Sequence, residues 1–456
     1  PQRRPRTFEQ TVNIAIKDCL EMLHNLETSE NQWRKLEASL HAVGALNKFC
    51  KDDNVALVPL MEALCQLFPH LPRLHGAHCS AVVLVGQMSL WLNANPKYIE
   101  VSMSIVLRSL RSPIKLDPNY PLQLKQNHVG SIAFEKIGRD CGNIISTGNP
   151  NLFFSLCKDL WSEQREVILD NKQDTLMVLN GLCFIASYVQ NAAIPQSRVE
   201  RMLLEPLIPV FNAVGRPDTS QTNISSTDLM FACSCLQVIF TSYKPSAYTT
   251  PDGVERGWHS LLLIEKYGQN VFALLSYDNK NFSNLNAEED VKNLEEARES
   301  LCKAIKSVWD NVKDNTHMCN DQSNLVAYVR SMVDGFGALL VKDLNTSSGQ
   351  NISGYLDVFK SVLIFSVQNK VAEDIVSNAV MEIVRILLKY PRVLHELPDA
   401  CIIFSDLLSV FVNAFPRFII ESSEVAKSLI EIIGIGLTIR YQKSGRKMIQ
   451  VAERCF

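Results

Sequence analysis

The sequence predicts an all-α fold, an open superhelix of stacked helix pairs, from three observations. The 456 residues include 19 Gly and 19 Pro, together about 8% of the chain against roughly 12% in ordinary proteins. Apolar residues recur at steps of three and four, and no stretch sustains the alternation of a strand. Polar or proline-containing breaks divide these stretches at a period of about 45–50 residues, in or just above the range of HEAT-type helical repeats.

Each element is predicted from an apolar face and the break that ends it. In residues 32–49, Leu36 and Leu40 share one helix face; a polar break at 51–54 follows, and the next helix ends before Pro69. This reasoning predicts about seventeen helices, eight pairs after one unpaired helix. They are 7–26, 32–49, 55–68, 75–95, 96–111, 121–142, 149–168, 172–191, 195–214, 224–243, 257–277, 286–313, 320–342, 352–369, 371–390, 397–415 and 423–442.

The chain is predicted to be a single continuous solenoid over residues 1–456, because no Gly/Ser-rich or Pro-rich linker divides it. Two connections are longer than usual, at 215–227 and 244–257. The chain starts without Met and ends inside a helical pattern, which predicts a fragment of a longer protein. The charge-free stretch 74–96 contains His, Gln and Asn, so we expect a buried helix there and no membrane span.

Composition narrows the class of partner. Lys and Arg number 45 and Asp and Glu 48, a net charge of -3, which argues against direct binding of nucleic acid. The 13 Cys are odd in number and scattered through apolar stretches, so they are predicted to be buried, reduced thiols of a reducing compartment.

One cluster of residue types that can bind metals is present. It comprises His70, His75, His78 and Cys79, across a loop and the start of a helix, with no second Cys/His pair at zinc spacing. We therefore expect loop histidines and a core thiol, and no metal.

No catalytic or cofactor motif is found. Gly434 and Gly436 lack the Gly-Lys-Ser/Thr sequence that holds phosphates, and there is no Gly-x-Ser-x-Gly sequence. The acidic residues near Glu295, with Lys292 and Arg298, are predicted to form a solvated helix face with ion pairs. The basic run 440–447 is predicted to be a loop between repeats. We expect neither enzymatic activity nor a cofactor.

Three segments resemble the importin-β superfamily of nuclear transport receptors (karyopherins). SENQWRKLEASLHAVG at 29–44 resembles the W-x-x-x-E-A-x-L opening of a helix in these receptors, and SAVVLVGQMSLWLNANP at 80–96 is similar to the following repeat. VGSIAFEKIGRDC at 129–141 resembles the helix after it. The resemblance is to the importin-13/transportin-3 branch. It is good over residues 29–142, weaker from there to 215, and beyond 215 it rests on the spacing of the predicted repeats alone.

The resemblance implies the central portion of a receptor that carries folded protein cargo through nuclear pores. Such receptors bind nucleoporins, shuttle between cytoplasm and nucleus, and exchange cargo under control of the GTPase Ran, whose main site lies in repeats upstream of this segment. The alternative is a HEAT-repeat scaffold of a cytosolic multiprotein complex that does not depend on Ran.

Cargo is expected to bind the concave face, which the resemblance assigns to the second, usually shorter helix of each pair. The spacing of residues decides which side of that helix faces outward. On 96–111 it leaves Ile99, Met103, Val106 and Leu110 for packing. The candidate protein-binding residues are Glu100, Arg108, Arg111, Lys158, Asp159, Glu163, Arg198 and Arg201.

Overall fold

A computed structural model gives the architecture of the chain. The described residues are 4–24, 30–47, 54–67, 75–111, 126–148, 150–162, 172–189, 196–208, 210–211, 225–244, 248–249, 255–256, 268, 271–276, 287–312, 322–345, 351–439 and 441–455.

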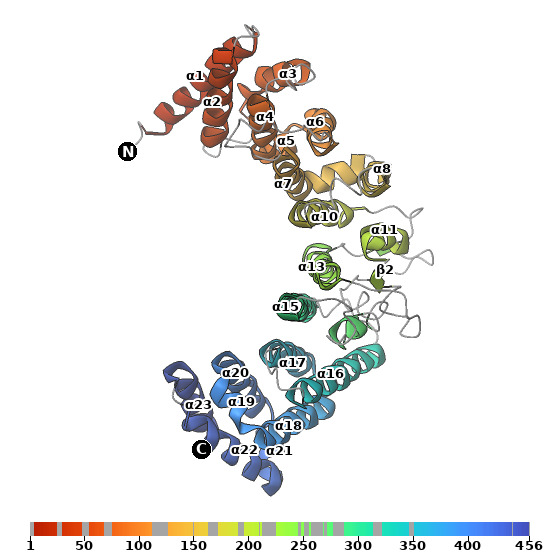
Figure 1. Ribbon diagram of the computed structural model, residues 1–456, viewed down its shortest axis with the longest axis vertical. Helices are drawn as coiled ribbons and strands as arrows, with labels where there is room; N and C mark the ends of the chain where they lie inside the picture. Colours follow the sequence, from red (N-terminus) through yellow and green to blue (C-terminus); the bar gives the residue numbers. More distant parts are fainter. Residues whose placement is uncertain are drawn as a thin grey trace. The chain divides into compact units, whose positions relative to one another are not determined.

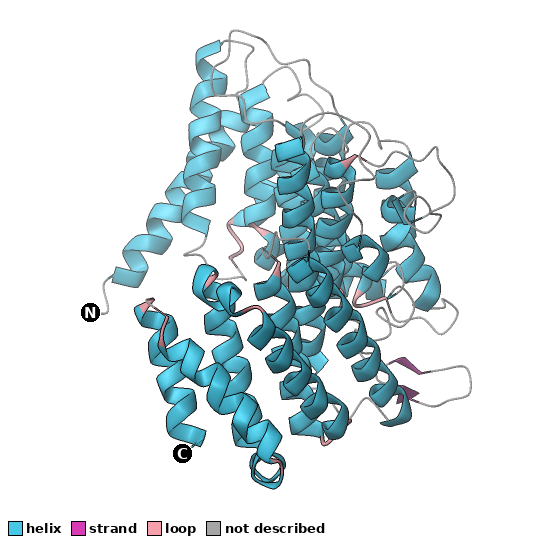
Figure 2. Cartoon of the chain, turned by 60° about the horizontal axis from the view of Figure 1, so that its bottom comes forward, coloured by secondary structure: helices cyan, strands magenta, loops and turns pink. Residues whose placement is uncertain are grey.

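The described part of the chain is almost entirely helical (Figure 2). Its two strands, β1 (Tyr248–Thr249) and β2 (Glu255–Arg256), have two residues each and pair antiparallel. The chain divides into two compact units, Pro1–Pro206 and Leu207–Phe456. The prediction of an all-α fold with packed helix pairs is confirmed.

The helices of the first unit form two layers (Figure 1). In the first layer α2, α4, α7 and α10 pack on one another in sequence order; α6 and α8 pack on α7, and α11 packs on α8 and α10. The bounds are α1 Arg4–His24, α2 Glu30–Asn47, α3 Leu57–Leu67, α4 His75–Gln87, α5 Ser89–Ala94, η2 Pro96–Tyr98, α6 Ile99–Arg111, α7 Gln126–Gly148, α8 Pro150–Ser162, α10 Lys172–Ala186 and α11 Gln196–Leu204.

The second unit has the same organisation. Its first layer is the series α13, α15, α17, α20 and α23, and α16, α18 and α22 form the second layer. The bounds are η3 Glu205–Leu207 at the border of the units, α13 Ser226–Ser242, α15 Ala287–Val312, α16 Gln322–Asn345, α17 Ile352–Asn369, α18 Glu373–Lys389, α19 Pro391–Glu396, α20 Pro398–Ala414, α21 Pro416–Glu421, α22 Ser423–Leu437 and α23 Gln442–Cys455.

Several predicted elements differ from the structure. The predicted helix 75–95 breaks at Met88 into α4 and α5, and the helix predicted at 121–142 is α7, which continues to Gly148. The short helices α19 and α21 were not predicted; each starts at a proline, which suits the first helical position because proline has no N–H to leave unpaired.

The prediction of a loop at 440–447 is wrong, because helix α23 begins at Gln442. The helix buries Ser444, Met448 and Val451 at steps of three and four, so its apolar side decides its conformation despite Gly445 and the basic residues.

The predicted long connections lie largely outside the described residues. Of 215–227 only the last three residues are described, and α13 starts there. The connection 244–257 contains the β1–β2 pair. Of the predicted helix 257–277, residues 268 and 271–276 are described and are helical.

The cysteines that are described contribute to the core. None of these eleven forms a disulfide, and nine are buried. Burial raises the pKa of the Cys19 thiol to about 12, and burial together with the nearby Glu37 charge raises that of Cys79 to about 11. Since the thiolate is the reactive form, the buried thiols are packing groups of low reactivity. The prediction that the cysteines are buried is confirmed for these nine.

Candidate protein-binding surface

Helix α6 separates its apolar and charged residues as the spacing predicts. Four apolar residues are each at most 5% exposed. They are Ile99, Met103, Val106 and Leu110. Glu100 and Arg108 are exposed on the other side of the helix. Packing of the apolar side on the neighbouring helices therefore turns Glu100 and Arg108 to solvent.

Helices α8 and α11 present three further candidate residues. Lys158 on α8 and Arg198 and Arg201 on α11 are exposed. The guanidinium of Arg198 lies over the ring of Phe154, 4.6 Å from its centroid, and so links α11 to α8. A cation–π contact at an exposed site stabilises by about 0.5–1 kcal/mol. The structure brings these three residues to adjoining helices, whereas α6 reaches α8 through α7, on which both pack.

The remaining candidates are described less fully. Arg111 and Asp159 lie in α6 and α8, where the backbone is described but these side chains are not. Glu163 lies outside the described residues. Their place on the surface stays a prediction.

The sequence did not reveal a set of polar contacts between neighbouring first-layer helices, which we call the first-layer ladder. In the first unit, Ser80 contacts His41 at 3.0 Å, His128 contacts Asp174 at 2.7 Å, and Asn180 donates to Glu135 at 2.9 Å. We include with them the contact from α5, in which Ser89 donates to Asp140 of α7 at 2.5 Å.

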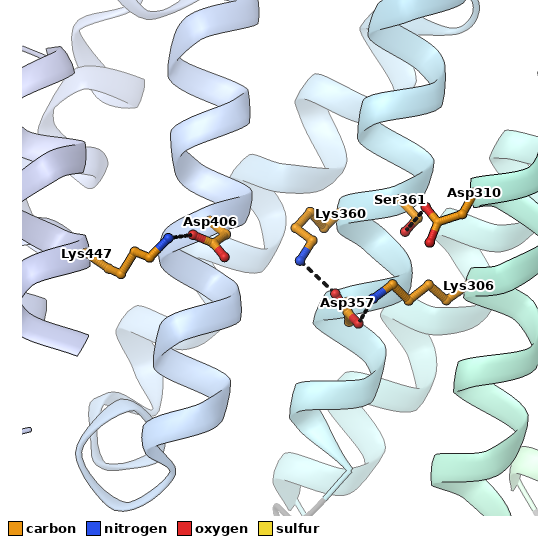
Figure 3. A network of polar contacts seen from close by, with 7 residues as sticks. All are labelled: Lys306, Asp310, Asp357, Lys360, Ser361, Asp406 and Lys447. Atoms are coloured by element: carbon orange, nitrogen blue, oxygen red, sulfur yellow. Dashed lines mark hydrogen bonds and ion pairs between the residues drawn. The ribbon is translucent and has the colours of Figure 1, made fainter. Parts of the chain in front are cut away.

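The ladder continues within the second unit (Figure 3). There Lys306 and Lys360 both contact Asp357, at 2.5 and 2.8 Å, Ser361 donates to Asp310 at 3.1 Å, and Lys447 contacts Asp406 at 2.7 Å. The contacts of Lys306, Ser361 and Lys447 join α15 to α17 and α20 to α23, whereas Lys360 and Asp357 both lie in α17.

The pKa of Asp357 shows that its two lysines outweigh its desolvation. Burial alone would raise the pKa of this carboxyl, but the hydrogen bonds and charges of Lys306 and Lys360 lower it below its ordinary value. A lowered pKa in the folded state stabilises the protein above the pKa of the unfolded state, and the contribution is lost as the pH falls through the folded value. The contact is therefore intact at neutral pH and weakens only in acid.

The interhelix contacts of the ladder named above share a sequence separation of 39 to 51 residues. This range includes the repeat period of about 45–50 residues that the polar and proline-containing breaks predict. Pairing polar residues about one predicted period apart could thus have identified several of these contacts from sequence, because successive packed helix pairs bring such residues close together.

Three of the four residues whose types could bind a metal lie in helix α4. His75 is the first residue of α4, His78 and Cys79 are buried within it, and His70 lies outside the described residues. Across the described ranges, no three His, Cys, Asp or Glu residues are grouped so that they could hold a metal ion.

The prediction of a solvated face near Glu295 is wrong for Arg298. Lys292 and Glu296 do form an exposed i,i+4 ion pair at 3.8 Å, but Arg298 is buried and pairs with buried Asp343 of α16 at 3.7 Å. Packing of α15 and α16 on α17 therefore encloses a charge that the helix sequence alone assigns to solvent.

Comparisons with known proteins do not indicate a function for this chain. No protein-family model matches the chain, and no curated protein matches it. No helix within the described ranges has the length and apolar character required to cross a membrane.

Proposed function

We propose that the chain is part of an importin-β-type nuclear transport receptor, a HEAT-repeat superhelix that binds folded protein cargo. In this proposal the second-layer helices α6, α8 and α11 of the first unit line the concave side and bind cargo. Transport under Ran control and contacts with nucleoporins follow from the sequence resemblance at 29–142. The proposal includes no chemistry by the chain itself.

The observation that carries this proposal is the repetition of the first-layer ladder at one repeat period. In each unit neighbouring first-layer helices contact one another through polar residues 39 to 51 apart, as expected for a quasi-one-dimensional repeat protein. Such arrays use their extended surfaces for binding partners, and transport receptors belong to this class.

The exposed charges of the second layer support a polar, folded partner. Glu100, Arg108, Lys158, Arg198 and Arg201 carry both signs of charge and are exposed. Mixed charges steer association and select partners more than they add affinity. A surface of this kind suits the polar exterior of a folded protein better than an apolar peptide.

Reversal of Arg108, Arg111, Arg198 and Arg201 to Glu is expected to weaken cargo binding at least 10-fold, because each reversal turns an attraction into a repulsion. Thermal stability should change little, since exposed charges contribute only about 0–1 kcal/mol each to folding. The binding partner is purified from a lysate by capture on the unaltered chain, and its affinity is then measured by titration calorimetry.

The matched control reverses four basic residues of first-layer helices, Arg34, Lys35, Lys136 and Arg139. We expect this control to bind cargo nearly as well as the unaltered chain. If the control loses binding while the second-layer variant retains it, cargo binds the first layer and the proposed surface is wrong.

A further inference from the structure

A cavity of about 410 Å³ lies within the second unit, where α15 meets the first turns of α17 and α20. Four carboxylates, which we call the acidic wall, line it together with one cation, Lys292, and Cys302 and Gly354 contribute apolar surface. The carboxylates are Glu295, Glu296, Glu299 and Asp399.

The acidic wall is only partly neutralised by neighbouring cations. Glu296 pairs with Lys292 at 3.8 Å and Glu299 with Lys303 at 2.5 Å, and in both pairs the side chains are at least half exposed. Asp399 is exposed in the first turn of α20 and forms none of the ion pairs between described residues. Burial is the main reason that the pKa of Glu295 is raised, although the charge of Arg298 lowers it. Asp399 is therefore the carboxylate of the wall that is available to a cation.

A hydrogen-bond donor lines the same cavity. Asn351 is 6% exposed and is the N-cap residue of α17, yet its side chain makes no capping hydrogen bond. Its buried Nδ2 has no hydrogen-bond partner. An unpaired buried donor destabilises the folded state, so an acceptor supplied by a ligand would remove a penalty that the protein otherwise carries.

We propose that this cavity binds a basic amino acid, arginine or lysine, either free or within a peptide. The cationic group lies against the carboxylates of α15 and Asp399, and the carbonyl or carboxylate of the same residue accepts a hydrogen bond from Asn351. The stem of the side chain covers Cys302 and Gly354. The proposal is independent of the cargo surface, which lies in the first unit.

The arrangement distinguishes this ligand from other cations. The carboxylates do not form a group that could hold a metal ion, whereas an ammonium or guanidinium reaches several acceptors through its separate N–H donors. A polyamine would match the acidic wall but offers no acceptor to Asn351. Only a cation with an acceptor a few bonds away satisfies both sides of the cavity.

Calorimetric titration of the full chain with N-acetyl-arginine amide is the test. We expect this probe to bind at least 10-fold more tightly than N-acetyl-citrulline amide, which has the same shape without the charge, because hydrogen bonds between charged groups are about twice as strong as neutral ones. Free L-arginine is the second probe: tighter binding of L-arginine assigns the free amino acid, and tighter binding of the blocked residue assigns a peptide. Binding of citrulline amide equal to that of arginine amide would overturn the proposal, as would no binding by either arginine probe.

Two variants locate the site. Glu295→Gln with Asp399→Asn should weaken binding of the arginine probe at least 10-fold, and Asp399→Asn alone tests the wall with an exposed residue whose change leaves the fold intact. Glu421→Gln with Glu431→Gln removes two exposed carboxylates of α21 and α22 and should leave binding unchanged. If both pairs of changes weaken binding equally, the arginine responds to general charge and the cavity is not its site.

Asn351→Ala tests the donor. In the unaltered chain butylguanidine, which has the guanidinium but neither a carbonyl nor a second charge, should bind more weakly than N-acetyl-arginine amide. In Asn351→Ala the two probes should bind alike. A difference between them that persists in the variant contradicts the role of Asn351.

Discussion

Gly138→Ala is expected to destabilise the first unit by about 3 kcal/mol, because the new methyl group would meet backbone and not a side chain that can rotate away. Helices α7 and α10 approach closely at this point. A Cβ on Gly138 would lie 2.6 Å from the carbonyl oxygen of Gly181 and 2.8 Å from its Cα. Neither atom can move without displacing α10.

Urea unfolding, with hydrogen exchange of the α7 and α10 amides, measures the effect. Gly337→Ala is the matched control: it lies inside α16, and a Cβ there meets nothing within 4 Å. Alanine in an open helical position is favoured over glycine by about 1 kcal/mol, so the control should be neutral or stabilising. Equal behaviour of the two variants would contradict the close packing of α7 on α10, on which the second-layer helices rest.

Asp343→Ala is expected to destabilise the second unit by about 3–5 kcal/mol, because it leaves the buried charge of Arg298 without its carboxylate. The Arg298 and Asp343 side chains are 9% and 3% exposed, and the Tyr355 hydroxyl donates to Asp343 at 2.9 Å. These three residues join α15, α16 and α17. Burial, followed by the charge of Asp343, raises the pKa of Tyr355 well above its ordinary value, so tyrosine remains the donor.

Two controls separate the buried charge from other effects, again by urea unfolding. Tyr355→Phe removes one hydrogen bond and should cost only about 1 kcal/mol. Arg385→Ala breaks an exposed contact with Glu424 at 3.1 Å and should cost less than about 1 kcal/mol. A loss for Asp343→Ala as small as that for Arg385→Ala would show that Arg298 is hydrated in solution.

The sequence predicts helices well where an apolar face decides the conformation. In α6 the spacing identified the buried Ile99 and Met103 and the exposed Glu100 and Arg108. The sequence-based prediction was wrong at α23, because glycine and basic residues within that segment indicate a loop. Packing of Met448 against neighbouring helices makes that segment helical.

Interactions across helices were harder to predict than the helices themselves. The burial of Arg298 depends on Asp343, which lies on the next helix, so no periodicity within α15 indicates it. The ladder contact between Lys306 and Asp357 likewise joins residues 51 apart. The cavity near Asn351 combines three helix segments from separate repeats, and its composition becomes apparent only when they are packed together.

Release of bound protein by Ran tests the proposed receptor function most directly. The natural full-length protein is immobilised with a captured partner, and the bound amount is measured after addition of Ran carrying GTP or GDP. A transport receptor predicts that the partner's affinity differs roughly 10-fold or more between the two nucleotide states, a normal size for coupling between two sites. The same affinity with Ran–GTP and Ran–GDP would contradict the account and favour a scaffold that does not depend on Ran.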